Sequence, residues 1–322
     1  MEFEDTILFS VFGFPVTAYA LCLAVSLAAG LALFFILGKK RGIGRDALWR
    51  TALLALPLGL IGARMFYCVA RIHFFLEIGL ENILRLWDGG YALWGAAGGC
   101  ALAALIAAKI EKQLVGTLMD ALAPPAALVI ALTRFAEYFS GEGRGLYMDE
   151  EAFCFFPVSV YRADYDMWHL AVFVWEGIAA LIILAVLLRR QRKNGQTARL
   201  FLLLYSACQI WMESMRRDST LRWLFVRVSQ LTAGLVIAGL MAAAVVRWVK
   251  SPDSRRMKPA GIILCWAVVL AGVGICIAME FSVEGKIFVD LPVWAAYAIM
   301  AVCCVGIGAA GYQTVFRSLK EE

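Results

Sequence analysis

Long apolar segments recur along the whole chain and constrain its fold more than any other feature. Nine stretches of about twenty mostly apolar residues could each cross the roughly 30 Å core of a bilayer as a helix. They span residues 15–37, 52–70, 91–108, 121–139, 168–188, 200–212, 228–246, 261–278 and 291–311, and the sixth needs polar neighbours to reach spanning length. Of 322 residues 62% are hydrophobic, which excludes a soluble protein. We therefore expect an all-α, polytopic membrane protein.

Basic residues predict the orientation of these segments. Lys and Arg gather in cytoplasmic loops, and here they follow every odd-numbered segment, whereas the acidic residues Glu2, Glu4 and Asp5 precede the first. The basic groups are Lys39, Lys40, Arg41, Arg45 and Arg50; Lys109 and Lys112; Arg189, Arg190, Arg192, Lys193 and Arg199; Arg247, Lys250, Arg255, Arg256 and Lys258; and Arg317 and Lys320. We expect the N-terminus outside, the C-terminus inside and a first segment that is retained rather than cleaved as a signal peptide.

The cysteines and the net charge argue against disulfides, a metal site and nucleic-acid binding. Nine cysteines lie mostly within apolar segments and form no CxxC pair, so we expect neither a disulfide framework nor a metal site. The formal net charge is only +5, and the basic loop clusters are typical of topology and of contacts with anionic lipid. A nucleic-acid partner is therefore not expected.

Several charged residues are not explained by topology, because they fall within apolar segments or at their outer ends. An ionised side chain at membrane depth costs at least about 2.5–3.5 kcal/mol. The clearest cases are Arg64 and Arg134, and further charges are Glu81, Arg85, Asp88, Glu213, Arg216, Arg217 and Asp218. These groups could pair among themselves, Arg134 with Glu137 or Tyr138, and Glu213 with Arg216 or Arg217. Alternatively, several guanidinium groups in one leaflet would suit the phosphate of an anionic lipid headgroup.

Glycine and proline mark two unusual places in the segments. Five glycines surround the start of the third segment: Gly89, Gly90, Gly95, Gly98 and Gly99. They indicate either close helix packing or irregular backbone that is buried in protein or lines a polar cavity. The Pro124-Pro125 pair predicts a break at the start of the fourth segment.

Short motifs in a fixed order resemble the bacterial phosphatidylglycerol:prolipoprotein diacylglyceryl transferase family over roughly residues 9–250. The most specific is Thr133-Arg-Phe-Ala-Glu-Tyr-Phe-Ser-Gly-Glu142, where the family reads Gly-Arg-Ile-Gly-Asn-Phe-x-Asn-Gly-Glu. Arg134, Gly141 and Glu142 are kept. The other pieces are Phe14-Pro15 with Tyr19; Gly62-Ala-Arg64 with Phe66-Tyr67; Arg85-Leu-Trp-Asp-Gly-Gly90; Asp120 with Ala123-Pro124; Glu176-Gly177; and Tyr205 through Glu213 to Arg216.

The resemblance implies a seven-span transferase-like domain in residues 1–250 of a bacterial inner-membrane protein, followed by two additional helices in residues 251–322. It implies transfer of a diacylglyceryl group from phosphatidylglycerol to the lipobox cysteine of prolipoprotein signal peptides, with release of glycerol phosphate and no cofactor. The candidate catalytic residues are Arg134, Glu137, Glu142 and Tyr205. The candidate phospholipid ligands are Arg134, Arg64, Arg85, Asp88, Tyr19, Gln209, Glu213 and Arg216.

Departures from the family pattern leave alternatives open. Trp94-Gly95-Ala96 stands where the family has His-Gly-Gly, Glu137 and Ser140 replace two Asn, Gln209 replaces a second Arg, and the Tyr-Glu pair before Glu176-Gly177 is missing. Glu137 could compete for Arg134, or it could be the base that replaces the missing His. The chain could also be a catalytically altered homologue that binds lipid or peptide. A small-molecule transporter would fit the proline break and Arg134 as well.

Overall fold

A computed structural model of the chain describes residues 7–11, 13–162, 166–189, 195–218, 221–223, 226–283 and 291–319. Some charges that predict the orientation lie outside these described residues, namely Glu2, Glu4, Asp5, Arg190, Arg192, Lys193 and Lys320. The orientation of the termini therefore stays a prediction.

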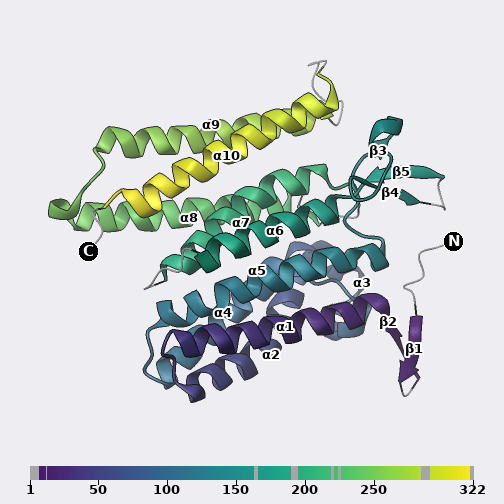
Figure 1. Ribbon diagram of the computed structural model, residues 1–322, viewed down its shortest axis with the longest axis horizontal. Helices are drawn as coiled ribbons and strands as arrows, with labels where there is room; N and C mark the ends of the chain where they lie inside the picture. The colour runs from purple at the N-terminus through teal and green to yellow at the C-terminus, as the bar shows by residue number, and fades with distance from the viewer. Residues whose placement is uncertain are drawn as a thin grey trace. The chain divides into compact units, whose positions relative to one another are not determined.

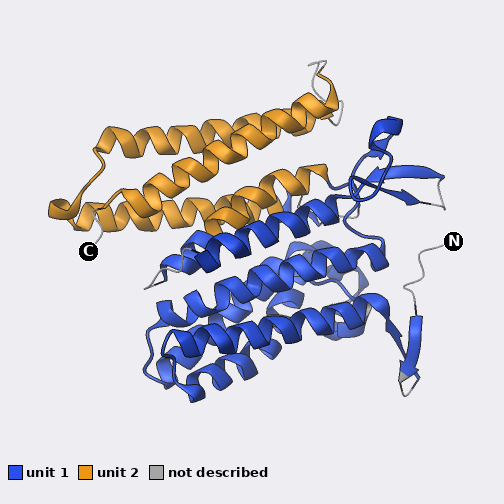
Figure 2. Ribbon diagram, viewed as in Figure 1, with its two compact units in different colours: residues 1–201, 216–228 blue, residues 202–215, 229–322 orange. Residues whose placement is uncertain are grey.

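The chain divides into two compact units, which Figure 2 shows in blue and orange. Unit 1 comprises Met1–Phe201 and Arg216–Val228, and unit 2 comprises Leu202–Met215 and Ser229–Glu322. The sequence predicts a boundary between two functional domains at residue 250. The compact units are defined by packing and do not test this boundary, so it stays a prediction.

Helices account for most of the described residues (Figure 1). They are α1 (Ala18–Lys40), α2 (Arg45–Ala70), α3 (Ile72–Ile78), α4 (Leu93–Ile110), α5 (Val115–Ser140), α6 (Val172–Arg189), α7 (Gln196–Met215), α8 (Val228–Lys250), α9 (Pro259–Val283) and α10 (Val293–Arg317). Eight are long and apolar enough to cross a membrane. The exceptions are the seven-residue α3 and the more polar α7, which corresponds to the short sixth segment. The prediction of an all-α polytopic membrane protein is confirmed.

Short strands and 3₁₀ turns lie between the helices. The strands β1 (Ile7–Val11) and β2 (Phe14–Thr17) form an antiparallel hairpin. The strands β3 (Tyr147–Met148), β4 (Ser159–Arg162) and β5 (Met167–Leu170) form a sheet in the order β3-β5-β4. The pair β6 (Arg222–Trp223) and β7 (Val226–Arg227) precedes α8. The 3₁₀ turns are η1 (Leu80–Leu84), η2 (Leu86–Asp88), η3 (Glu151–Phe153) and η4 (Pro252–Ser254).

Two of the expected segments begin as strands rather than as helices. Residues 15–17 belong to β2, and α1 starts only after Thr17, whose Oγ1 accepts the N–H of Ala20 at 3.2 Å. Residues 168–170 likewise belong to β5, and α6 starts at Val172. Apolar composition alone does not separate a strand from a helix over so few residues.

The predicted break at Pro124-Pro125 is wrong, because α5 runs through both prolines. The helix begins at Val115, so the pair lies in its interior rather than at its start, and both prolines are buried. Helices in membranes tolerate interior prolines where neighbouring groups satisfy the freed backbone carbonyls.

The glycines of α2 and α4 serve close packing between these helices. A Cβ on Gly62 would lie 2.4 Å from the carbonyl oxygen of Gly95, and one on Gly99 would lie 2.0 Å from that of Leu58. Only glycine fits at such a backbone approach. The preceding turn is irregular as well, with φ of +73° at Gly89 and +75° at Gly90. Close helix packing therefore holds at Gly95 and Gly99, and irregular backbone at Gly89 and Gly90.

Polar contacts join the residues that follow α1 to residues near the starts of α5 and α7. The fully buried carboxylate of Asp120 on α5 accepts the N–H groups of Gly195 and Ala198 at 2.9 Å, which caps the start of α7. Arg41, which follows α1, lies 3.6 Å from the same carboxylate and donates to Thr197 Oγ1 at 3.2 Å. Residues that follow α1 and residues near the starts of α5 and α7 thus meet in unit 1.

Within unit 2, α10 packs against α9 and against residues 202–215 of α7. Trp211 Nε1 donates to the carbonyl of Tyr297 at 3.2 Å. A Cβ on Gly308 would lie 3.5 Å from Ala207, which is ordinary contact, whereas one on Gly311 would lie 2.6 Å from Leu203. Small residues on α10 thus allow close approach to α7.

Candidate active site

Arg134 and Glu137 lie one turn apart near the C-terminal end of α5. This spacing places them on one helix face. This end of α5 lies on the same side of unit 1 as strands β3–β5 (Figure 1). Arg134 Nη1 donates to Glu137 Oε1, and Arg134 Nε lies 2.9 Å from Glu176 Oε2 on α6. The predicted pairing of Arg134 with Glu137 is confirmed, and Glu176 extends it to a second helix.

Arg216 follows α7 and joins the same carboxylates. Its Nη1 atom lies 3.1 Å from Glu176 Oε2 and 3.6 Å from Glu137 Oε2. Its Nε and Nη2 atoms hold Asp218 at 3.2 and 2.6 Å, which is the two-point geometry that guanidinium groups favour. We call Arg134, Glu137, Glu176, Arg216 and Asp218 the Arg134 cluster, and all five belong to unit 1.

Backbone contacts fix the turn that covers the Arg134 cluster. Gly143 has a φ of +71°, and a Cβ there would lie 2.3 Å from Glu137 Oε2. Any other residue at this position would therefore collide with the Glu137 carboxylate. The N–H of Gly143 donates to Asp218 Oδ2 at 2.8 Å. The buried Arg227 donates to the carbonyl of Arg216 at 2.8 Å, and the N–H of Arg217 donates to that of Arg144 at 2.7 Å.

The cluster holds more carboxylates than guanidinium groups. Glu137, Glu176 and Asp218 share Arg134 and Arg216, and the partly solvent-exposed Glu142 lies close enough to feel their charges. Lost hydration and the charge of Glu137 raise the pKa of Glu142. Burial works to raise the pKa of Asp218 too, but the hydrogen bond and charge of Arg216 outweigh it and hold that pKa below its usual range.

Arg64 has a different environment from Arg134. It is buried on α2 and donates to the carbonyl oxygens of Asn82 at 2.8 Å, Ile83 at 3.1 Å and Gly90 at 3.5 Å, and also to that of Gly89. It therefore fixes residues 82–90, the loop that carries Arg85, which is exposed between η1 and η2. The side chain of the candidate ligand Asp88 lies outside the described part of the chain.

The remaining candidates lie elsewhere in the two units. Tyr19 is half-buried in the first turn of α1 in unit 1. Tyr205, Gln209 and Glu213 are buried on the part of α7 that belongs to unit 2, where Gln209 Nε2 donates to Glu213 Oε2 at 2.8 Å. Their roles at a common site stay predictions.

Glu176 and Asp218 are absent from the candidate residues taken from the sequence. Glu176 did carry a signal, because it is the one acidic residue of an otherwise apolar segment, and ionisable residues in spans mark functional sites. Asp218 is among the charges that topology does not explain, but nothing in the sequence assigns it a partner or a role.

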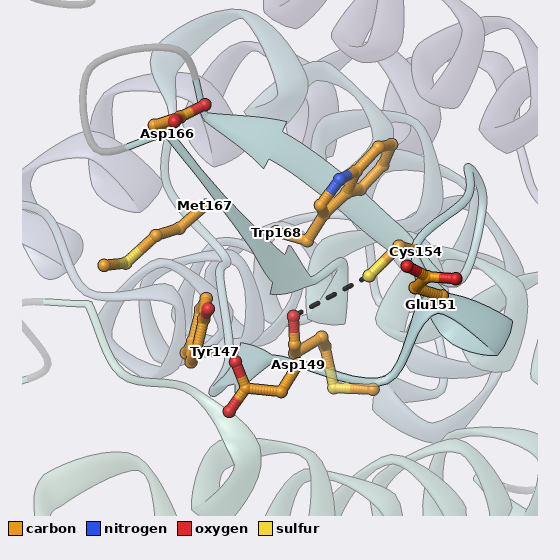
Figure 3. Close-up of a pocket in the computed structure, with 8 residues that line it drawn as sticks. Tyr147, Asp149, Glu151, Cys154, Asp166, Met167 and Trp168 are labelled. Atoms are coloured by element: carbon orange, nitrogen blue, oxygen red, sulfur yellow. Dashed lines mark hydrogen bonds between the residues drawn. The ribbon is translucent and has the colours of Figure 1, made fainter.

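A cavity of about 410 Å³ lies between η3 and strands β3 and β5 of unit 1 (Figure 3). It is lined by Tyr147, Met148, Asp149, Glu151, Cys154, Asp166, Met167 and Trp168. The Cys154 thiol donates to the carbonyl of Met148 at 3.7 Å. None of the candidate catalytic residues lines this cavity, so the Arg134 cluster remains the best-supported candidate active site.

Comparisons with known proteins place the chain in a family. The family model described as prolipoprotein diacylglyceryl transferase matches residues 6–248. Relatives named phosphatidylglycerol–prolipoprotein diacylglyceryl transferase include those of Frankia alni, 29% identical over 74% of this chain and 65% of the relative, and Clostridium kluyveri, 29% identical over 73% and 94%. That of Listeria innocua is 26% identical over 76% of this chain and 91% of the relative. The chain belongs to the prolipoprotein diacylglyceryl transferase family.

Proposed function

We propose that the chain transfers a diacylglyceryl group from phosphatidylglycerol to the lipobox cysteine thiol of prolipoproteins in the bacterial inner membrane, with release of glycerol phosphate. The observation that carries this proposal is the Arg134 cluster, in which guanidinium groups from two distant parts of the chain meet on the carboxylate of Glu176. Fixed cations in a site with little water are what a departing phosphate requires.

The reaction places three demands on the site. The thiol sulfur attacks the glycerol carbon, the carbon–oxygen bond to the phosphate breaks, and negative charge grows on the leaving phosphate. Arg134 stabilises that charge, supported by Arg216, and loss of one such donor typically costs about 2.7–4 kcal/mol. The thiol must also lose its proton to a base.

Glu142 is the better of the two candidate bases. Glu137 is bound to the guanidinium groups of Arg134 and Arg216, so its carboxylate is already occupied. Glu142 is open to solvent and its pKa is raised, which suits a group that takes a proton and passes it on to water. Glu142→Gln should therefore slow turnover while lipid binding persists.

A catalytically altered homologue that binds lipid or peptide is the second candidate function. The surplus of carboxylates favours it, because Glu137 occupies the guanidinium groups that a phosphate would need. The transporter alternative loses one of its two supports, since α5 is continuous through Pro124 and Pro125.

Reconstitution separates the two remaining candidates. The purified protein in vesicles of phosphatidylglycerol receives a lipobox peptide, and mass spectrometry follows both the thioether product and glycerol phosphate. We expect both products to appear together. Folded protein that binds the lipid without forming either product would contradict the transferase and support the altered homologue.

A further inference from the structure

Three further arginines lie beside the Arg134 cluster and change its charge balance. They are Arg144, Arg217 and Arg227. Arg144 follows Gly143, which lies against Glu137, and its carbonyl accepts the N–H of Arg217 at 2.7 Å. Arg227 donates to the carbonyl of Arg216 at 2.8 Å. With Glu142 included, the site holds five arginines and four acidic residues, so a further anion meets no surplus of negative charge.

Arg217 is the member of this group whose guanidinium has no partner among the residues that the structure describes. Arg134 and Arg216 bind carboxylates, and Arg144 and Arg227 are almost fully buried. Arg217 is half-buried, and its Nε atom is shielded from solvent but donates to no described acceptor. A buried donor without an acceptor is costly, and native structures leave few of them. An acceptor from outside the chain would remove this cost.

The backbone around Arg217 is fixed next to the Arg134 cluster. Its own N–H is bound to the turn after α5, and its neighbours Arg216 and Asp218 bind each other at 3.2 and 2.6 Å. Asp218 also accepts the N–H of Gly143 at 2.8 Å. These bonds hold the loop after α7 against the turn after α5. A ligand bound to the Arg217 guanidinium therefore stays close to the Arg134 cluster.

On the basis of the proposed function, we propose that Arg217 binds the phosphate of the incoming donor lipid and holds the headgroup beside the Arg134 cluster before the reaction. A guanidinium offers several N–H donors in one plane, which matches two oxygens of a phosphate. Arg134 and Arg216 would have to give up carboxylates to bind the lipid first, whereas Arg217 gives up none. Arg217 thus acts in binding, and Arg134 acts on the leaving phosphate.

Binding of the lipid, measured without turnover, tests this role. Short-chain phosphatidylglycerol is titrated into the purified full-length protein in detergent, and native mass spectrometry gives the dissociation constant. Arg217→Gln should weaken the affinity about tenfold, equivalent to about 1.4 kcal/mol. Arg217→Lys keeps the charge and should recover most of the affinity. If Arg217→Gln does not fold, Arg217→Met, which keeps the apolar stem, takes its place.

Arg222→Gln is the matched control variant. It removes the same charge from the exposed start of β6, a few residues further along the chain, and should leave the affinity unchanged. If Arg222→Gln weakens binding as much as Arg217→Gln, the lipid responds to the general charge of this surface, and the role of Arg217 is overturned.

Two further ligands show which part of the lipid Arg217 contacts. Diacylglycerol lacks the phosphate and should bind equally to wild type and Arg217→Gln. Glycerol phosphate carries the phosphate without acyl chains. A loss of affinity for phosphatidylglycerol, with or without a parallel loss for glycerol phosphate, supports the proposal. A loss confined to glycerol phosphate overturns it and assigns Arg217 to the released product.

Kinetics distinguish failure of this proposal from failure of the proposed function. In the transferase assay Arg217→Gln should raise the KM for phosphatidylglycerol about tenfold and change kcat little, because ground-state binding is lost. An unchanged KM overturns the role of Arg217 and keeps the transferase. Folded wild type that binds the lipid through Arg217 but forms no product overturns the transferase and keeps the binding site.

Discussion

Arg64 and Arg134 are both guanidinium groups within helices of unit 1, but their partners differ in kind. Arg64 donates to backbone carbonyl oxygens of one loop, whereas Arg134 binds carboxylate side chains from α5 and α6. A carbonyl fixed in a turn cannot move away without unfolding that turn. A carboxylate on a rotatable side chain can give way to another anion. The comparison separates a guanidinium that maintains the fold from one that can exchange ligands.

The largest expected effect is on stability, at Arg64. Arg64→Ala should lower the free energy of unfolding by about 5 kcal/mol, because several hydrogen bonds from a charged donor are lost together. Thermal unfolding in detergent measures the change. Arg71→Ala, which removes an exposed contact with the hydroxyl of Tyr67, is the matched control and should change stability by less than about 1 kcal/mol. If the two variants unfold alike, Arg64 does not hold the loop as described.

Arg134→Ala, in contrast to Arg64→Ala, should lower activity and leave the fold intact. We expect turnover in the reconstituted assay to fall by about 10²–10³-fold, since a cation on the leaving phosphate is lost. The protein should remain inserted and folded, because Arg216 still pairs with Glu176 and Glu137. Circular dichroism of the same preparation is the check. Wild-type turnover in this variant would remove Arg134 from the active site.

Asp218 should make the stability of the folded protein depend on pH through the Arg134 cluster. Its pKa is lower in the folded protein than in the unfolded chain, so the ionised carboxylate stabilises the fold above the unfolded pKa. This contribution is lost as the pH falls through the folded pKa. Asp218→Asn should cost about 3 kcal/mol near neutral pH and show a smaller further loss on acidification than wild type. Unfolding curves from about pH 7 to about pH 3 test this, and parallel curves for both proteins would contradict it.

The smallest predicted effect concerns the packing that positions Arg64. Gly99→Ala should cost about 1–2 kcal/mol, because its Cβ would meet the backbone at Leu58 and the helices would have to separate. Gly98→Ala is the matched control on the same helix. A Cβ at Gly98 meets nothing within 4 Å, so this variant should be neutral or slightly stabilising. Equal losses in the two variants would show that close α2–α4 contact is not the reason for the glycines.

The sequence predicted the helices well because apolar length is a property of each segment by itself. One of the pairings that it left open, Arg134 with Glu137, is present, because the spacing of these residues on one helix allows that contact. It did not predict that Glu176 and Asp218 join them, since these contacts depend on how α5, α6 and the loop after α7 come together. The error at Pro124 and Pro125 has the same origin, because only the tertiary surroundings decide whether a helix continues through proline.

The carbonyl partners of Arg64 also bear on how this region can change in evolution. Every residue type offers a backbone carbonyl, so most side chains of residues 82–88 can be replaced while the bonds to Arg64 persist. Only Gly89 and Gly90 are restricted, by their positive φ and, at Gly90, by the ring of Tyr67. The Arg134 cluster has no such freedom, because each of its bonds requires a particular side chain. Most residues of the loop can thus be substituted one at a time, while the Arg134 cluster can change only through paired substitutions.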